Sequence, residues 1–210
     1  MAVYIESSLW PHAVPYVADE KAEQQIQRFN QSVRKAVFVQ RATDSKNPDH
    51  VVFKPSDGHS ACTIGKKGGA QTLLYTPESI IHEMCHCLGL GHENFHKDWP
   101  LGKLLVDRIA AYERKEAERI KTQRNKAPLH NAPVEHYPVH AKAYSTNVKK
   151  YTSLEESYDP LSIMLYSPAA LFHDQPLPPE ALAPFVPNTQ LSQWDIAAIK
   201  KLYAFVADLA

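Results

Sequence analysis

The sequence predicts an α+β fold. Three observations support this class: an early helical pattern, a run of short strand candidates after it, and two strongly capped helical patterns later. The chain has 210 residues, which suits one compact domain or two small lobes that share a cleft. With 44% hydrophobic and 22% charged residues, its composition is typical of an ordinary globular protein.

The first predicted helix runs from Asp19, a suitable N-cap, to about Lys35. Its apolar residues recur at helical spacing: Ala22, Ile26, Phe29 and Val33. Four strand candidates follow, separated by turn-forming clusters. They are Ala36–Arg41, His50–Lys54, Ser60–Ile64 and Ala70–Tyr75.

A second helix is predicted to start at Thr76 as the N-cap, with Pro77 at the first helical position, where the fixed φ of proline fits. Its apolar residues are Ile80, Ile81, Met84, Cys85 and Leu88. A long charged helix is predicted from Leu101 to about Lys126, and a proline-rich loop from Pro168 to Pro187.

The last helix begins at a capping box formed by Ser192 and Asp195. One apolar stripe is expected to continue along it to the end of the chain. This stripe consists of Ile196, Ile199, Leu202, Val206 and Leu209.

The overall charge gives no indication of nucleic-acid binding, and the hydropathy gives none of a membrane-spanning segment. Lys+Arg and Asp+Glu are equal at 23 each, so nothing indicates nucleic acid. No apolar run approaches the roughly 20 residues that a membrane span needs. The start of the chain, from Met1 to Glu6, lacks the pattern of a signal peptide, which leaves a removed leader, leaderless export or an intracellular protein open.

The second helix carries the chemistry. His82 and His86 stand one turn apart on one helix face, so both imidazoles can hold one metal ion, and Glu83 lies beside its open coordination site. Gly89 allows the helix to end in a left-handed turn, which brings His92 back as a third ligand. Three neutral histidines with an open position predict a catalytic site with one Zn²⁺.

Other candidate ligands are less consistent with the pattern. Cys62, Cys85 and Cys87 allow at most one disulfide and are expected to be buried packing residues. The alternative is that Cys85 or Cys87 enters the metal shell, although the histidines already occupy the helix face. The spacing of His130, His136 and His140 matches no ligand template, so surface histidines are expected there rather than a second metal site.

The segment from Tyr158 to Ser167 complements the histidine motif. A methionine turn that follows the third histidine is the second half of the metzincin signature, and Met164 occupies this place. Among metzincins the chain resembles the astacin family. The resemblance rests on His92-Glu93 and on the pattern Ser162-Ile163-Met164-Leu165-Tyr166, with further similarity in Leu9–Tyr16, Ile64–Gln71 and Leu191–Tyr203.

The resemblance implies a single astacin-like catalytic domain over residues 1–210. It implies an upper lobe, about 1–92, with a twisted mixed sheet and two helices. It also implies an irregular lower lobe, about 93–210, with a long terminal helix. The zinc ion would lie at the floor of the cleft between the lobes.

It also implies roles for residues. His82, His86 and His92 would bind zinc, and Glu83 would activate a zinc-bound water as the general base. Tyr166 would be a further zinc ligand that swings off the metal to hydrogen-bond the transition state, and Met164 would form a hydrophobic floor. The implied reaction is hydrolysis of internal peptide bonds without a covalent intermediate.

Glu93 supports the site in the family, where this glutamate is linked to the buried amino terminus of the mature enzyme. Since Leu9 and Trp10 lie so near the start, no propeptide is expected. We hypothesise that Met1 is removed and that the Ala2 ammonium approaches Glu93, directly or through water. The alternative is that Glu93 caps local backbone or faces water.

The chain departs from the family in some respects. The usual four disulfide-forming cysteines are not recognisable, and Leu165 stands where histidine is common. The resemblance favours a secreted or exported protein, whereas the missing disulfide framework and signal peptide do not. The expected state is a monomer.

Substrate would be a protein or peptide bound in extended form. It could add a strand to an edge near Gly68–Leu74, with Lys66 and Lys67 either favouring acidic side chains or simply solvated. Two other functions stay open: a catalytically silent metal-binding or peptide-binding module, and a zinc hydrolase that acts on a non-peptide substrate.

Overall fold

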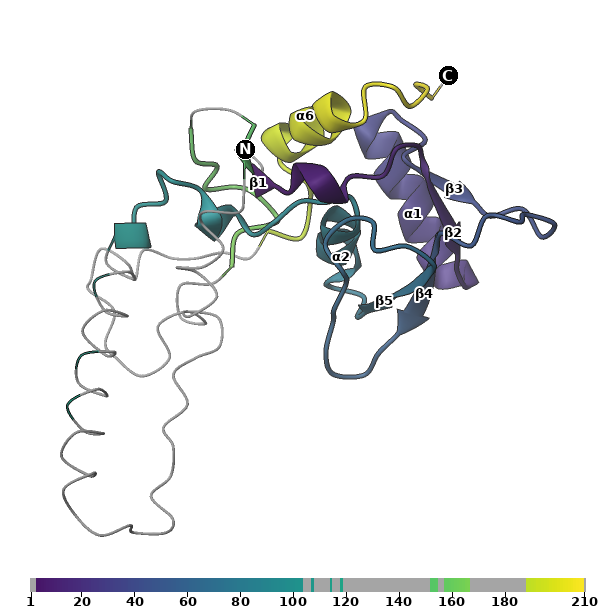
Figure 1. Cartoon of the computed structure of the whole chain (residues 1–210), viewed down its shortest axis with the longest axis horizontal. Coiled ribbons are helices and arrows are strands. Elements are labelled where there is room, and N and C mark those ends of the chain that lie inside the picture. The colour runs from purple at the N-terminus through teal and green to yellow at the C-terminus, as the bar shows by residue number, and fades with distance from the viewer. Residues whose placement is uncertain are drawn as a thin grey trace, which may run out of the picture.

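The computed structural model describes residues 3–103, 107, 114, 118, 152–154, 157–166 and 188–209. Within them, three α-helices accompany one four-stranded and one two-stranded sheet, which agrees with the predicted α+β class (Figure 1). The two-stranded sheet pairs β1 (Val3–Tyr4) with β6 (Thr152–Ser153) in antiparallel register. Among the described helices, none combines the length and hydropathy needed to cross a membrane.

The four-stranded sheet has the order β3-β2-β4-β5. Its strands are β2 (Val14–Val17), β3 (Phe38–Gln40), β4 (His50–Pro55) and β5 (Ala70–Tyr75). All three pairings of these strands are parallel, whereas a mixed sheet was implied by the family resemblance. The antiparallel contribution to this sheet is one isolated bridge between Ala61 and Leu74.

The predicted strand Ser60–Ile64 is therefore wrong in extent. Directly after it the chain turns away from the sheet at Gly65, which has a φ of +67°. The Gly65 amide donates to the His86 carbonyl at 2.8 Å, and the Lys66 amide donates to the Ser8 carbonyl at 2.6 Å. These bonds hold the segment against α2 and the entry segment, so it cannot continue along β5.

Helix α1 (Glu20–Val33) forms where the sequence predicts it. The Asp19 side chain accepts a hydrogen bond from the Ala22 amide at 2.8 Å, which confirms Asp19 as the N-cap. The helix ends at Arg34 in the left-handed conformation, with a φ of 56°. Its predicted apolar stripe is fully buried against the sheet: Ala22, Ile26, Phe29 and Val33.

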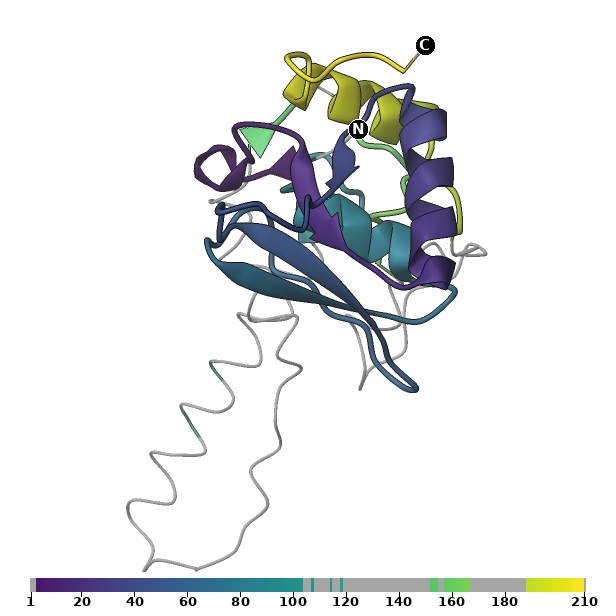
Figure 2. The same cartoon turned by 90° about the vertical axis from the view of Figure 1, so that its right-hand side faces the viewer.

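Helices α1 and α2 (Ile80–Cys87) lie on the same side of the sheet (Figure 2). An edge-to-face pair of Phe29 and Phe38 joins α1 to the sheet, with 5.7 Å between the ring centroids. A second pair within the sheet, Phe38 and Phe53, has centroids 6.1 Å apart. The inner sheet residues and these helices form one hydrophobic core, because alternate strand residues point to the same face.

The predicted start of α2 is wrong by three residues. Residues 77–79 form a turn, and the helix begins at Ile80 with Ser79 as its N-cap. The hydroxyls of Ser60 and Ser79 both accept from the Thr76 amide, at 3.2 and 3.0 Å. This long-range contact from Ser60 stabilises the turn in place of a first helical turn.

Helix α6 (Gln193–Leu202) begins at the predicted capping box of Ser192 and Asp195. It has 10 residues, so the long terminal helix is wrong, and Val206 and Leu209 lie beyond its end. The tail instead pairs with the turn that follows α1, where the Lys35 ammonium donates to the Val206 carbonyl at 2.7 Å and pairs with Asp208 at 2.8 Å. Figure 1 shows α6 beside α1.

Several predictions fall outside the described residues. These are most of the helix from Leu101 to about Lys126, the histidines at 130, 136 and 140, and the proline-rich loop 168–187. The described parts of the predicted helix are helical at Gly102, Lys103, Asp107, Arg114 and Glu118.

Candidate metal centre

The three histidines of the motif converge. The Nε2 atoms of His82 and His86 are 3.1 Å apart, and those of His86 and His92 are also 3.1 Å apart. Each histidine offers a ligand atom within 4.8 Å of the other two. Among the described residues, this is the one group of at least three such side chains that could hold a metal ion.

The tautomers of two histidines favour a cation between them. His82 Nδ1 lies 2.9 Å from the Ile163 carbonyl oxygen, and His86 Nδ1 lies 2.8 Å from that of Leu90. Since a carbonyl can only accept, each Nδ1 carries the proton and each Nε2 presents its lone pair to the centre. Tetrahedral zinc with Zn–N bonds of about 2.0–2.1 Å would hold its nitrogens about 3.3 Å apart, so the residues fit this ion.

Burial favours the neutral form of two of these histidines. It lowers the pKa of His86 to about 3 and lowers the pKa of His82 as well. Both imidazoles therefore stay neutral near pH 7, which is the form that binds zinc.

Glu83 lies beside this centre on α2 and is only 6% exposed. Burial raises the pKa of its carboxyl group to about 7. Within the described part of the chain, its Oε2 atom is buried without a hydrogen-bond partner. A carboxyl group with this pKa can both accept and return a proton near neutral pH.

The end of α2 is shaped by residues from both ends of the chain. The Trp10 indole donates to the Cys87 carbonyl at 3.0 Å, and the Tyr203 hydroxyl donates to the Leu88 carbonyl at 2.9 Å. These side chains satisfy carbonyls that a helix leaves unpaired at its C-terminus. Gly89 then takes a φ of +98°, which turns the chain toward His92.

Gly89→Ala is expected to lower the melting temperature and weaken zinc binding. The positive φ costs a non-glycine residue about 1–2 kcal/mol, and an added Cβ would lie 2.7 Å from Leu9 Cδ2. The matched control is Gly58→Ala, because nothing lies within 4 Å of a Cβ there. Thermal melts and zinc titration of both variants check this; equal behaviour of the two would contradict it.

The methionine turn lies beside the histidines. Met164 is fully buried, and its carbonyl accepts from the Glu93 amide at 2.9 Å. The ring centroid of Tyr166 lies 4.6 Å from that of His92 and 6.5 Å from that of His82. The structure thus brings together six of the predicted site residues: His82, His86, His92, Glu93, Met164 and Tyr166. The seventh, Glu83, follows His82 on α2.

A closed circuit of hydrogen bonds supports this turn, and we call it the anchoring ring. Its six members are Glu93, Asp159, Ser192, Asp195, Ser162 and Met164. The Asp159 amide donates to Glu93, and the Ser192 hydroxyl donates to Asp159, at 2.9 and 2.6 Å. The ring joins the residue after the third histidine to the methionine turn and to the start of α6.

Asp195 is the centre of the anchoring ring and is fully buried. Its carboxylate accepts from the Ser162 hydroxyl at 2.7 Å, from the Ile163 amide at 3.0 Å and from the Ser192 amide at 2.9 Å. The sequence marked Ser192 and Asp195 as a helix cap but carried no signal for their contact with the methionine turn. Asp159 and Ser162 were missed as supporting residues for the same reason.

Glu93 is also fully buried, which rules out the alternative that it faces water. Its Oε1 accepts from the Asp159 amide, 66 positions along the chain, so the contact is not local capping. Burial raises the pKa of the Glu93 carboxyl group to about 8.

Two of the three cysteines are buried packing residues as predicted, whereas Cys62 is only partly buried. Cys85 and Cys87 are fully buried with free thiols, and neither belongs to the histidine group. Burial raises the pKa of both thiols well above the ordinary value, which disfavours the thiolate that would bind a metal.

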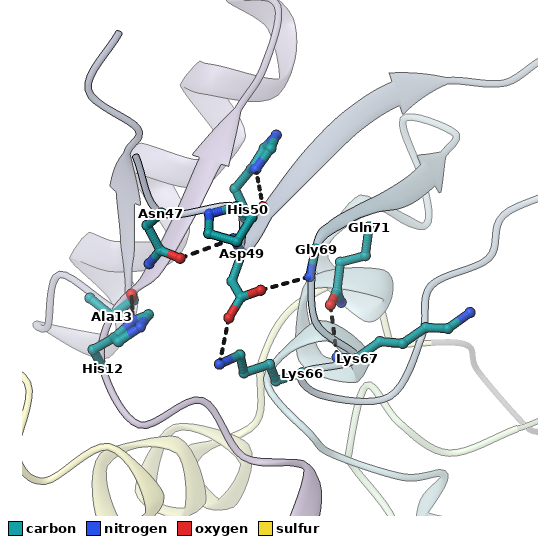
Figure 3. A network of polar contacts seen from close by, with 10 residues as sticks. His12, Ala13, Asn47, Asp49, His50, Lys66, Lys67, Gly69 and Gln71 are labelled. Carbon is teal, nitrogen blue, oxygen red and sulfur yellow. Dashed lines mark hydrogen bonds and ion pairs between the residues drawn. The ribbon is translucent and has the colours of Figure 1, made fainter. Parts of the chain in front are cut away.

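The two lysines of the loop before β5, Lys66 and Lys67, differ in their contacts, although the sequence predicts the same behaviour for both. Lys66 points toward Asp49 and forms an ion pair with it at 2.6 Å, whereas Lys67 points away (Figure 3). Asp49 also accepts from the Gly69 amide at 2.6 Å. Lys66 therefore holds the two loops together, and of the pair only Lys67 extends from them as an exposed cation.

Comparisons with known proteins agree with this geometry. The family model for astacin, which describes a family of peptidases, matches residues 2–101. The comparison with curated proteins finds no match. Among solved structures, the chain is similar to high choriolytic enzyme 1, a hatching enzyme zinc-protease from the medaka fish Oryzias latipes, with a TM-score of 0.55 and 24% identity.

That similarity covers 95% of this chain and 96% of the fish protein, and it shows a shared fold. The matched family segment contains the four-stranded sheet, α1, α2 and the three histidines. Over residues 2–101 the chain is therefore similar to the astacin family of peptidases, and over nearly its whole length it shares the fold of a zinc-protease.

Proposed function

We propose that this chain hydrolyses internal peptide bonds of protein substrates at the centre formed by His82, His86 and His92. The observation that carries the proposal is the convergence of three Nε2 atoms beside a buried carboxyl group whose Oε2 has no partner in the described residues. A zinc ion bound there supplies a Lewis acid and lowers the pKa of water toward about 7.

Three side chains of the protein would supply the other catalytic and supporting roles. Glu83 accepts a proton from the attacking water and passes it to the leaving amine, so no covalent intermediate is needed. Tyr166 serves as a further ligand and then as a hydrogen-bond donor to the oxyanion; its ring lies beside His92. Met164 forms an apolar floor, consistent with its complete burial.

We further propose a single catalytic domain over residues 1–210, with an upper lobe to about residue 92 and a lower lobe after it. All strands of the four-stranded sheet, with α1 and α2, precede residue 92, which supports this division. The described segment 157–166, after residue 92, consists of turns and irregular backbone.

Substrate is proposed to bind in extended form along the sheet edge at β5. This strand is the last in the order of the sheet, and Ala61 already pairs with its outer edge at Leu74. A peptide would add through main-chain hydrogen bonds to the part of this edge that precedes Leu74. Any preference for acidic side chains would rest on Lys67, since Lys66 is paired with Asp49. The proposed active state is the monomer.

The test is digestion of an unstructured protein before and after treatment with a zinc chelator. Cleavage should stop on chelation and return when zinc is added, because the three histidines hold the ion required for hydrolysis. Cleavage that survives chelation would contradict the metal mechanism. Bound zinc without any cleavage would favour a silent binding module instead.

The link between the amino terminus and Glu93 is also a proposal, and Ala2 lies outside the described residues. The described neighbours support it: the Gly91 amide donates to the Val3 carbonyl at 2.7 Å, and Tyr4 forms an isolated β-bridge with Leu90. The start of the chain therefore runs beside the residues that precede Glu93.

A bulky N-terminal extension is accordingly expected to lower the melting temperature and the activity. A buried ammonium group would lose its place near Glu93, where burial disfavours the charged carboxylate. Thermal melts and kcat of an extended chain check this, with the same extension at the C-terminus as the control. Unchanged values at the N-terminus would refute the link.

A further inference from the structure

Asn94 contacts Tyr166 in a way that the sequence does not signal, since 72 positions separate them. Its side chain is 1% exposed. Oδ1 accepts from the Tyr166 amide at 2.6 Å, and Nδ2 donates to the Tyr166 carbonyl at 3.2 Å. One side-chain amide thus pairs with both main-chain groups of the proposed oxyanion donor.

We propose that Asn94 is a positioning residue for Tyr166. This inference rests on the proposed function, in which the Tyr166 phenol assists the reaction. Asn94 follows His92 by two residues, and the intervening Glu93 amide donates to the Met164 carbonyl at 2.9 Å. Two hydrogen bonds to Tyr166 and one to Met164 therefore hold this stretch of backbone close to the proposed third zinc ligand.

The geometry suits the motion that the reaction requires. Both bonds from Asn94 end on main-chain atoms of Tyr166, so they fix its Cα position and leave its side-chain torsions free. The phenol ring can then move between the metal and the substrate while its pivot stays in place. A displacement of a catalytic group by about 1 Å can cost as much as about 10²-fold in rate.

Only an amide of this length satisfies both groups, because it offers one donor and one acceptor in the same plane. Alanine would leave the Tyr166 amide and carbonyl without these partners. Aspartate would keep the volume and the acceptor but lose the donor to the Tyr166 carbonyl.

The chain contains a matched control in Asn30. Its Nδ2 donates to the Phe38 carbonyl at 2.8 Å, and its Oδ1 accepts from the Phe38 amide at 3.1 Å. The side-chain amide of Asn30 thus pairs with both main-chain groups of one residue, as that of Asn94 does, but it joins α1 to β3. Asn30→Ala therefore removes an equivalent pair of hydrogen bonds without touching the proposed site.

The experiment measures kcat, KM, zinc content and melting temperature for the zinc-loaded enzyme. Asn94→Ala should lower kcat about 10-fold or more, with zinc content unchanged and KM altered less than about twofold. Asn30→Ala should lower the melting temperature similarly and leave kcat unchanged. In a Tyr166→Phe background, Asn94→Ala should change kcat by less than about twofold, because the hydroxyl it positions is gone.

Equal kcat values for the Asn94→Ala and Asn30→Ala enzymes would overturn the proposal. So would a loss of kcat that is just as large in the Tyr166→Phe background, since that would show a general structural role. Tyr166→Phe alone reports on the proposed function: full activity of that variant would refute the role of Tyr166. If Asn94→Ala does not fold, Asn94→Asp is tested in both backgrounds against the same criteria.

Discussion

Glu83→Gln is expected to lower kcat for peptide-bond hydrolysis about 10²–10⁴-fold, the range for loss of a general acid–base group. Glutamine keeps the shape of the side chain but cannot take a proton from water. Zinc binding should persist, because the three histidines supply the ligands. Digestion of an unstructured protein, together with zinc analysis of the same samples, measures both effects.

The matched control for this variant is Glu78→Gln. Glu78 is exposed in the turn before α2, so its substitution should leave both kcat and zinc content unchanged. A Glu83→Gln enzyme that retains more than about a tenth of the wild-type kcat would contradict the role of general base.

The same variant also has a pH signature in the metal-free protein. Burial raises the pKa of Glu83 from 4.5 to about 7 in the folded state, so the folded protein retains a proton that the unfolded chain releases. Wild type should therefore lose stability relative to Glu83→Gln as the pH rises from about 4.5 to about 7. Urea denaturation of both metal-free proteins across this window checks the sign.

Asp195→Ala is expected to lower the free energy of unfolding by about 3–5 kcal/mol, because it leaves two buried donors and one partly buried donor without their acceptor. These donors are the Ser162 hydroxyl and the amides of Ile163 and Ser192. The loss is a large part of the roughly 5–15 kcal/mol that stabilises a domain. It should also weaken zinc binding, because Ile163 holds His82 through its carbonyl.

Urea denaturation and zinc titration measure these two effects. The exposed Asp44 provides the control, since Asp44→Ala should change the free energy of unfolding by less than about 0.5 kcal/mol. An Asp195→Ala protein within about 1 kcal/mol of wild type would show that the anchoring ring contributes little to stability.

Local signals in the sequence predicted most of the secondary structure that the structure describes. The N-cap at Asp19, the capping box at Ser192 and the strand Ala70–Tyr75 each depend on neighbouring residues, and each forms as expected. The convergence of the three histidines was also predictable from neighbouring residues. His82 and His86 share one helix, and Gly89 places the turn that returns His92.

The wrong predictions share a physical cause, which is a contact between distant segments. The start of α2 moved because Ser60 hydrogen-bonds the Thr76 amide, and the terminal helix ended early because the tail binds Lys35. Asn94 and Asp159 have no distinguishing pattern in the sequence. Their hydrogen bonds, from Asn94 to Tyr166 and from Asp159 to Glu93, are visible only in the folded structure. Periodicity and capping cannot reveal such partners, because the sequence does not state which distant groups will meet.

The anchoring ring has a consequence for the order in which the protein folds. Its bonds span 66 positions from Glu93 to Asp159 and 33 positions from Asp159 to Ser192, so they cannot form until these distant parts of the chain have met. Closing such long loops is slow, because much chain entropy is lost before any contact is gained. The sheet with α1 and α2 can assemble from nearer neighbours. We therefore expect the candidate metal site to be completed late in folding, together with the docking of the start of α6.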